Sequence, residues 1–437
     1  MNDRFGMSSV GRRAVLKGIA GSTILPLVGG FPNAASAQEP VEIVIWQWAP
    51  GFESYIDAFN RSHPGIVLKQ VLTTNSQDTG LKLRNALLAG SGGPDITFCN
   101  YWMVPSMDYA GAFRDITEQA ASVKDRFVPA FVEASTFDGK IKLIPLDAPP
   151  LLQFYRADIL EGMGLSAPET WDDLARAAEV VRSKSPDSYI TNATFTNGEW
   201  VTALCWQAGW KGFKLDGTTL TVDVNGAAAQ KVAQFWQPLL DGKLVSADLG
   251  FTNDFYHAVD NGKYLSLMMG SWFPAVIGAN ASQTLGKWRT AFVPRWQKGD
   301  DFSPLFGGAG FGVFSQTKHP DEAWEVLKWL TTESPAKEMW VTQNSLVPTL
   351  TDVLADPAMQ GATFAFTGDQ KVNEIAFKAV TQVKKPFIWA PFQDFVLKTL
   401  EEEVGAAASG SGTLLEGFGR AQDKIVAYAT EQGFTVA

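Results

Sequence analysis

Aromatic side chains follow several segments that the sequence predicts to be strands. They are Trp48 after the run 41–46, Tyr101 and Trp102 after 95–98, Trp272 after 265–269, and Trp200 after turn residues at 197–198. In open α/β sheets, ligands bind beyond the carboxyl ends of strands. A flat ring covers the apolar C–H face of a sugar, and carboxylate and amide groups bind its hydroxyls. Together these residues indicate a binding cleft, whereas core packing is the alternative for each one taken singly.

Residue patterns that perform catalysis are harder to find. The four Gly-Lys pairs precede Ile, Leu, Tyr and Trp, so neither the Ser nor the Thr that completes a phosphate-binding loop follows. The glycine-rich run 308–312 misses the dinucleotide-binding spacing, and neither a Gly-x-Ser-x-Gly elbow nor a His-Glu-x-x-His pair occurs. With 46 acidic residues, pairs of carboxylates suited to glycoside hydrolysis are expected by chance, so their presence does not indicate an enzyme. Only three histidines occur, and they are scattered. We therefore expect no catalytic residue, no cofactor and no metal site.

The composition narrows the class of protein. The chain has 437 residues and a formal charge of −10, and it carries no basic stripe that would bind nucleic acid. Its 15 Trp and 29 Phe provide enough apolar surface to exclude a disordered chain. A chain of this length usually divides into more than one domain. Cys99 and Cys205 are able to pair in an oxidising compartment, and two buried free thiols are the expected alternative.

The first 37 residues have the pattern of an export signal. Arg12 and Arg13 with Leu16 and Lys17 precede an apolar stretch at 18–28 that is too short to span a bilayer. Small residues then allow cleavage near Ala37. The paired arginines favour a twin-arginine signal, and an ordinary secretory signal with two adjacent arginines is the alternative. Because no cysteine lies at the cleavage point, we expect a soluble exported protein without a lipid anchor.

Alternating strands and helices predict a parallel, helix-covered sheet at the start of the mature chain. The expected strands are 41–46, 66–72, 95–98 and 265–269; the expected helices cover Phe52 to Phe59, 81–89, a segment capped by Thr170 and Asp173, 321–330 and a last one through Ile425 and Val426. The Gly/Ser run 405–412 is expected to be a loop. No linker separates two halves of the chain, so we predict two α/β lobes between which the chain passes more than once.

The order of these motifs resembles the extracellular solute-binding proteins of ABC transporters, in the carbohydrate-binding group that includes maltose-binding protein. The resemblance covers essentially the whole mature chain. It is carried by the opening strand at 41–46, Gly-Gly-Pro-Asp-Ile at 92–96, the Gly-Lys…Pro hairpin at 137–145, the Gly-Lys…Gly-Ser-Trp segment at 261–272 and Phe-Gly-Gly-Ala-Gly at 306–310. Arg156 departs from the pattern, since the family usually has Asn or Asp there.

The resemblance implies two α/β lobes joined by three crossovers near 145–150, 306–308 and 347–349, with the ligand between them. The first lobe would comprise 38–147 and 309–349, and the second 148–308 and 350–437. Carried over position by position, the ligand contacts would be Gln47, Trp48, Asn100, Tyr101, Trp102, Asp147, Glu199, Trp200, Trp272, Gly307, Gly308 and Trp389. For Trp389, packing among the last helices is the alternative.

The function implied is a monomeric periplasmic protein that binds a mono- or oligosaccharide and delivers it to the permease subunits of an ABC importer, without performing chemistry. Two alternatives remain open. One is a secreted carbohydrate-active enzyme that uses a carboxylate pair in the same cleft. The other is the same fold with another ligand, a polyamine, a metal or a phosphorylated compound. The aromatic and amide side chains at the strand ends favour a neutral sugar over these solutes.

Overall fold

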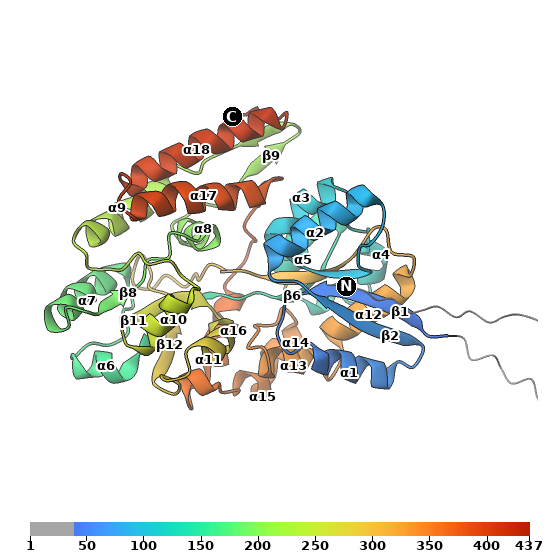
Figure 1. Ribbon diagram of the computed structural model, residues 1–437, viewed down its shortest axis with the longest axis horizontal. Helices are drawn as coiled ribbons and strands as arrows, with labels where there is room; N and C mark the ends of the chain where they lie inside the picture. Colours follow the sequence, from blue (N-terminus) through green and yellow to red (C-terminus); the bar gives the residue numbers. More distant parts are fainter. Residues whose placement is uncertain (1–38) are drawn as a thin grey trace, which may run out of the picture. The chain divides into compact units, whose positions relative to one another are not determined.

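The structure is a computed structural model that describes residues 39–437 (Figure 1). The expected export signal at 1–37 lies outside the described residues. No helix within residues 39–437 has the length and apolar character required to cross a bilayer.

A five-stranded mixed sheet forms the centre of what we name the first lobe. Its strands, in spatial order, are β2 (Ile66–Leu72), β1 (Val41–Gln47), β3 (Ile96–Asn100), β13 (Ala309–Val313) and β6 (Ile144–Asp147). Strand β1 runs parallel to β2 and β3, as the sequence pattern predicts, while β13 is antiparallel to β3 and β6. Helices α1 and α12 pack together on one face and α2 covers the other (Figure 1), so the inner strands β3 and β13 are buried along almost their whole length.

A four-stranded sheet forms the centre of the second lobe. Its strands, in spatial order, are β12 (Trp288–Phe292), β7 (Leu151–Arg156), β11 (Tyr264–Gly270) and β8 (Tyr189–Thr191). Two smaller sheets accompany the large ones. They are the hairpin β4 (Thr136–Phe137) with β5 (Lys140–Ile141), and the trio β9 (Lys214–Asp216), β10 (Thr219–Thr221) and β14 (Thr435–Val436).

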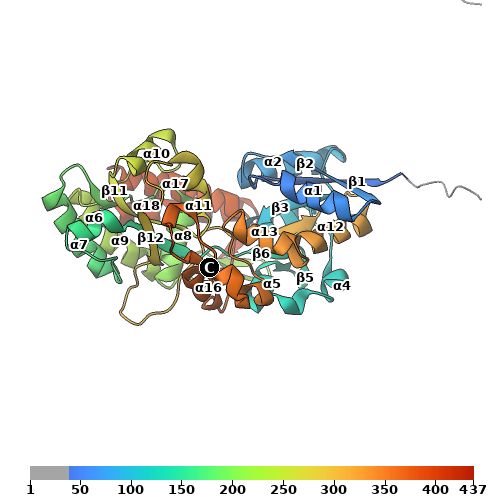
Figure 2. The same cartoon turned by 90° about the horizontal axis from the view of Figure 1, so that it is seen from below.

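Helices surround both sheets. Those before β7 are α1 (Glu53–Ser62), α2 (Ser76–Ala89), η1 (Tyr101–Met103), α3 (Val104–Tyr109), α4 (Thr117–Ala120), η2 (Lys124–Arg126) and α5 (Pro129–Ala134). Those between β7 and β13 are α6 (Ala157–Gly162), α7 (Trp171–Lys184), α8 (Gly198–Gln207), α9 (Ala227–Asp241), α10 (Asn253–Asp260) and α11 (Phe273–Asn280). Those after β13 are α12 (Pro320–Thr332), α13 (Ala336–Thr342), α14 (Thr351–Ala355), α15 (Pro357–Gln360), η3 (Ala365–Thr367), α16 (Val372–Thr381), α17 (Gln393–Ala408) and α18 (Leu414–Glu431). Helix α17 packs against both α8 and α18, and the three helices lie near one another in both views (Figures 1 and 2).

Local signals set several helix ends. The capping box predicted before α7 is present, because Thr170 and Asp173 each accept a hydrogen bond from the other's backbone N–H. Helix α2 begins five residues earlier than the predicted 81–89, since the side chain of Asn75 caps it. The predicted loop at 405–412 is partly wrong. Helix α17 continues through Gly405 to Ala408 because the absence of a side chain at Gly405 lets it lie against Thr196, where a Cβ would be 3.2 Å from Cα.

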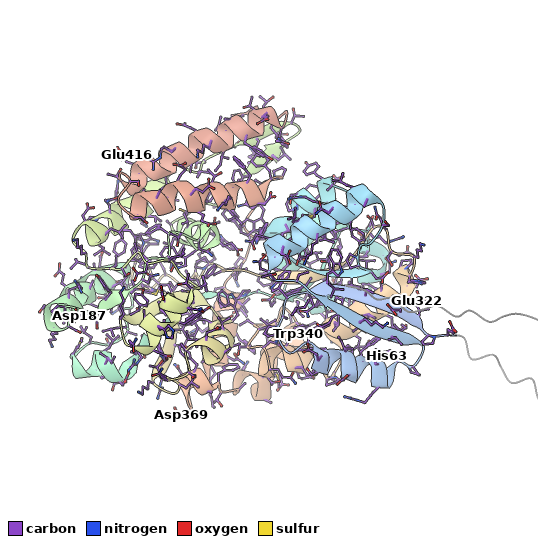
Figure 3. The ribbon with its side chains drawn as sticks, in the orientation of Figure 1. His63, Asp187, Glu322, Trp340, Asp369 and Glu416 are labelled. Atoms are coloured by element: carbon purple, nitrogen blue, oxygen red, sulfur yellow. The ribbon has the colours of Figure 1, made fainter. Side chains whose placement is uncertain are left out.

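The tryptophan excess is largely a matter of core packing. Fully buried tryptophans occur in both lobes. They are Trp171, Trp200, Trp236, Trp288 and Trp340, and they are among the largest fully buried side chains of the protein. The ring of Trp340 (Figure 3) lies 4.2 Å from that of Tyr55 in the first lobe. Both cysteines are buried and unpaired, which confirms the alternative of two free thiols.

Candidate functional site

Three segments of the chain cross between the sheets side by side. The first links β6 to β7, the second links β12 to β13, and the third precedes α14. The backbone N–H of Ala148 donates to Val347 O at 2.9 Å, and that of Phe306 donates to Pro149 O at 3.0 Å. The three predicted crossovers are therefore confirmed, and hydrogen bonds hold them together as a short ladder between the lobes.

Tyr101 is anchored to this ladder from the end of β3. Its backbone N–H donates to Gly308 O at 3.0 Å, and its hydroxyl donates to Asp147 O at 3.0 Å. Gly308 has φ +111°, and a Cβ there would lie 2.9 Å from Cε2 of Tyr101. Only glycine suits both this backbone conformation and the close ring. Two of the predicted site residues, Tyr101 and Gly308, are thus packed against each other.

Asp147 is a buried carboxyl group at the first crossover. Its Oδ1 accepts a hydrogen bond from the backbone N–H of Ala309 at 2.9 Å. Burial raises the pKa of Asp147 to about 7, although the hydrogen bond from Ala309 lowers it. Around neutral pH both the protonated and the ionised form of Asp147 are therefore populated.

Trp102 and Glu199 form a hydrogen bond between the lobes. Trp102 lies in η1 at the end of β3, and Glu199 lies in the first turn of α8. The indole Nε1 of Trp102 donates to Oε1 of Glu199 at 3.1 Å. Burial raises the pKa of Glu199 to about 7, against the bond from Trp102, which lowers it. The pair places an aromatic face and a carboxyl group together where the lobes meet.

Trp272 lies at the second crossover, on the turn after β11. Its indole Nε1 donates to Phe306 O at 2.9 Å, and a Cβ at Gly307 would lie 3.4 Å from the same nitrogen. The backbone N–H of Ser271 donates to Pro150 O at 3.1 Å, which ties this turn to the first crossover. Trp272 is partly exposed, so a face of its ring is available beside the ladder.

Phe251 extends this aromatic wall, and the sequence analysis missed it. Its ring centroid lies 6.0 Å from that of Trp272, and its side chain is partly exposed. Its backbone has φ +61°, a left-handed conformation that is uncommon for a bulky residue. No sequence motif marks this position, since an aromatic residue after Gly250 gives no sign of its backbone angle.

The remaining first-lobe residues lie at the ends of β1 and β3. Trp48 is partly exposed, with its ring 4.5 Å from that of Phe98. Gln47 is buried; its Nε2 donates to Gln70, while its Oε1 has no partner among the described residues. Asn100 is partly exposed, and its backbone pairs with Ala309. These three side chains are thus placed at the same edge of the first sheet.

Trp200 does not belong with the others. It has no exposed surface, its Nε1 donates to Met268 O at 3.0 Å, and its ring packs 5.7 Å from Trp236. It follows Glu199 in the chain, but successive residues of a helix point in different directions, so Glu199 faces the other lobe while Trp200 faces the core. The expectation that Trp200 contacts a ligand is corrected on this ground.

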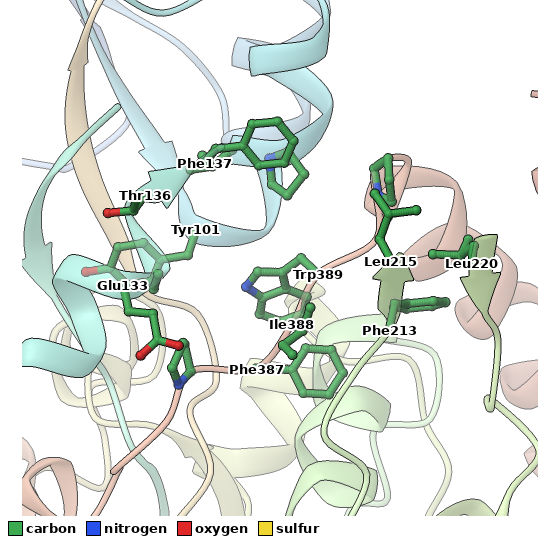
Figure 4. A pocket seen from close by; sticks show the side chains of 15 residues that line it. Tyr101, Glu133, Thr136, Phe137, Phe213, Leu215, Leu220, Phe387, Ile388 and Trp389 are labelled. Carbon is green, nitrogen blue, oxygen red and sulfur yellow. The ribbon is translucent and has the colours of Figure 1, made fainter. Parts of the chain in front are cut away.

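Trp389 lies in an extended segment beside a cavity that is also lined by Tyr101 (Figure 4). It is partly exposed, so it is not one of the fully buried core tryptophans. Two ion pairs cross between the lobes nearby: Arg84 of α2 with Asp394 of α17 at 2.8 Å, and Glu133 with Lys385 at 3.1 Å. The site thus has side chains from both lobes and hydrogen-bonding groups beside aromatic faces. Among residues 39–437, no group of three or more His, Cys, Asp or Glu side chains is placed to hold a metal ion.

Comparison with known families and proteins gives consistent results. A family described as bacterial extracellular solute-binding protein matches residues 46–337. The chain is 24% identical over 339 residues to an arabinooligosaccharide-binding protein of Halalkalibacterium halodurans, covering 73% of this chain and 74% of that one. It is 24% identical over 371 residues to a multiple sugar-binding protein of Streptococcus mutans, covering 76% and 81%.

Solved structures share the fold. An ABC transporter associated binding protein from B. animalis subsp. lactis, in complex with beta-1,6-galactobiose, superimposes with a TM-score of 0.82 at 25% identity, covering 91% of this chain and all of that one. The galacto-N-biose-/lacto-N-biose I-binding protein of Bifidobacterium longum superimposes with a TM-score of 0.81 at 23% identity, covering 92% of this chain and all of that one. The predicted two-lobe α/β binding-protein fold is therefore confirmed.

Proposed function

The chain belongs to the family of bacterial extracellular solute-binding proteins, and from this premise we propose that it is the sugar-binding component of an ABC importer. One observation carries the proposal: Trp102 of the first lobe donates to Glu199 of the second, and Trp272 donates to Phe306 O on the second crossover, so that indole rings and a carboxyl group lie where the two lobes meet. The names of the relatives, which are proteins that bind sugars, support the same ligand class.

Its mechanism is closure of the two lobes around the ligand. The three hydrogen-bonded crossovers restrict the motion of the lobes to a hinge. A ligand that touches both lobes stabilises the closed form over the open one. Trp48, Asn100, Tyr101 and Trp102 would contact the ligand from the first lobe, and Glu199, Trp272 and Trp389 from the second. Gln47 and Asp147 would complete the polar lining, and Gly307 and Gly308 would let the ligand approach the backbone.

The raised pKa values of Asp147, which is buried, and of Glu199, which is partly exposed, favour a neutral ligand over a polyamine. Because burial raises the pKa of both Asp147 and Glu199 to about 7, neither is held as a full negative charge at neutral pH. A protonated carboxyl group donates to a sugar hydroxyl, and an ionised one accepts from it. Both forms therefore serve a polyol, whereas a cation requires the ionised form.

The place of action follows from the family and from the first 37 residues. We propose export to the periplasm, by the twin-arginine route, and cleavage near Ala37. We further propose that the mature protein acts as a monomer that presents its closed form to the permease subunits, without chemical change of the sugar. The lobe boundaries at 147/148, 308/309 and 349/350 complete the proposal.

The test is a thermal-shift and tryptophan-fluorescence screen of the purified protein against mono-, di- and oligosaccharides, sugar alcohols and polyamines. A ligand at 100 times its Kd raises the free energy of unfolding by about 2.7 kcal/mol, which gives a clear rise in Tm. A sugar that binds and is recovered unchanged after long incubation supports transport binding. Hydrolysis of the sugar would instead support the enzyme, and a response to polyamines alone would overturn the ligand class.

A further inference from the structure

An apolar cavity of about 250 Å³ adjoins the proposed sugar site (Figure 4). One wall comes from the first lobe, with Tyr101 and Phe137. The opposite wall comes from the segment 386–389 and from Leu215 of β9. Tyr101 joins the cavity to the crossovers, because its ring lines the cavity while its backbone and hydroxyl are bound at Gly308 and Asp147.

The second-lobe wall is held in place by backbone hydrogen bonds. The N–H of Phe213 donates to Ile388 O at 2.9 Å, and the N–H of Ile388 donates to Lys211 O at 3.1 Å. Gly212 has φ +94°, and a Cβ there would lie 2.0 Å from Ile388 O, so the two strands approach as closely as glycine allows. This wall is therefore preorganised, and closure of the lobes brings the first-lobe wall against it.

Three of the polar side chains around the cavity, those of Glu133, Thr136 and Tyr101, already have partners. Glu133 pairs with Lys385 at 3.1 Å, and the hydroxyl of Thr136 donates to Val132 O at 2.7 Å. The hydroxyl of Tyr101 donates to Asp147 O. A sugar ring that entered here would desolvate its hydroxyl groups with few protein groups to replace the water, which is unfavourable. The cavity is therefore poorly suited to a second sugar ring.

The cavity also presents apolar surface that no protein group covers. Leu215 is 38% exposed and Ile388 is 53% exposed, although both belong to the wall. Exposed aliphatic side chains that gather in one concave place mark a binding surface more often than scattered ones do. Their natural partner is an apolar group of the size of one ring.

We propose that the ligand is a glycoside whose sugar occupies the cleft at Trp102, Glu199 and Trp272 and whose apolar, ring-sized aglycone occupies this cavity. The inference rests on the proposed function, since the sugar positions the aglycone. Tyr101 and Trp389 cover the faces of the aglycone ring, and Leu215 and Ile388 bury its edge. The protein thereby distinguishes a substituted sugar from the free one.

The experiment compares matched ligands by titration calorimetry. The probes are galactose, glucose and arabinose, each as the free sugar, the methyl glycoside and the 4-nitrophenyl glycoside in both anomeric forms, together with lactose and cellobiose. For the sugar that binds, the nitrophenyl glycoside is expected to bind about tenfold tighter than the methyl glycoside, because one aromatic ring leaves water. In Leu215→Gln this ratio should fall to about two, while the affinity for the methyl glycoside stays unchanged.

Leu415→Gln is the matched control, because Leu415 is 47% exposed on α18 and does not line the cavity. It should keep the wild-type ratio. Equal affinities for the methyl and nitrophenyl glycosides would overturn the aglycone inference while leaving sugar binding in place. A disaccharide that binds tighter than every nitrophenyl glycoside would also overturn it, by showing that the cavity takes a second sugar. Absence of binding by every probe would overturn both proposals.

Discussion

The indole Nε1 of Trp102 lies 3.1 Å from Oε1 of Glu199, and this hydrogen bond joins the end of β3 in the first lobe to the first turn of α8 in the second. Both groups are of the kind that binds a polyol, and here each satisfies the other. A ligand that enters between the lobes would replace this bond with its own hydroxyl groups, so that the gain in ligand contacts is offset in part by the lost bond.

Glu199 is expected to make stability depend on pH in a definite direction. Burial raises its pKa from an ordinary value of 4.5 to about 7. Between these values the unfolded chain releases the proton and the folded chain retains it, so this group's contribution to stability is lost as the pH rises from 4.5 to 7. Glu199→Gln should therefore gain stability relative to the wild type over that range, by about 1 kcal/mol or more. Urea denaturation between pH 4.5 and 8.5 measures the difference.

An exposed carboxylate provides the control for this experiment. Glu118→Gln changes an exposed side chain on α4 in the same way. Its stability difference from the wild type should not increase between pH 4.5 and 7. If Glu199→Gln and Glu118→Gln gave the same pH profile, the raised pKa of Glu199 would be disproved.

Trp272→Ala tests the stacking surface beside the crossovers. Removal of the ring should weaken the binding of the sugar identified in the screen by about 1–3 kcal/mol in binding free energy, because the apolar face of the sugar loses its contact with the ring. Calorimetry on the folded variant gives the value. Trp324→Ala removes an equally large, partly exposed ring on α12, away from the crossovers, and should leave Kd unchanged. An unaltered Kd in Trp272→Ala would assign that ring to packing only.

Gly308→Ala tests the contact with Tyr101. The new methyl group would meet Cε2 of Tyr101 at 2.9 Å, on a backbone with φ +111° that side chains rarely adopt. We expect a loss of about 1–3 kcal/mol in the free energy of unfolding, together with weaker sugar binding as Tyr101 is displaced. Gly299→Ala, at φ +97° with nothing within 4 Å, carries the backbone strain without the clash. A smaller loss in Gly299→Ala isolates the clash, and equal losses would exclude it.

Phe251→Gly separates binding from stability. Glycine adopts φ +61° without strain, so relief of strain should offset part of the lost packing on Trp272. We expect a modest fall in Tm and a severalfold rise in Kd, as measured by thermal denaturation and calorimetry. Lys243→Gly, at an exposed residue with φ +51°, should raise stability by up to about 1 kcal/mol and leave Kd unchanged. A large fall in Tm with constant Kd would show that Phe251 serves packing alone.

Much of the fold was predictable because its signals are local. Strand β1 is a run of β-branched residues, and α7 begins with a Thr170 cap whose partner lies three residues on. The three crossovers were implied by the resemblance to a known family, which rests on the order of its motifs. Errors occurred where a local signal was outweighed by packing, as at Gly405, which lies inside α17 and whose lack of a side chain allows close packing against Thr196.

The candidate site, too, was predictable in part from local signals and depended in part on the tertiary structure. From the amino-acid sequence alone follow the class of the chain, the alternation of its strands and helices, and the aromatic residues near the strand ends. Only the tertiary structure distinguishes Trp102, which reaches Glu199 of the other lobe, from Trp200, which is buried against Trp236. It also brings Phe251 to Trp272 and Leu215 to Ile388. The physical reason is that burial and contact depend on residues far apart in the chain, which no local pattern of residue types records.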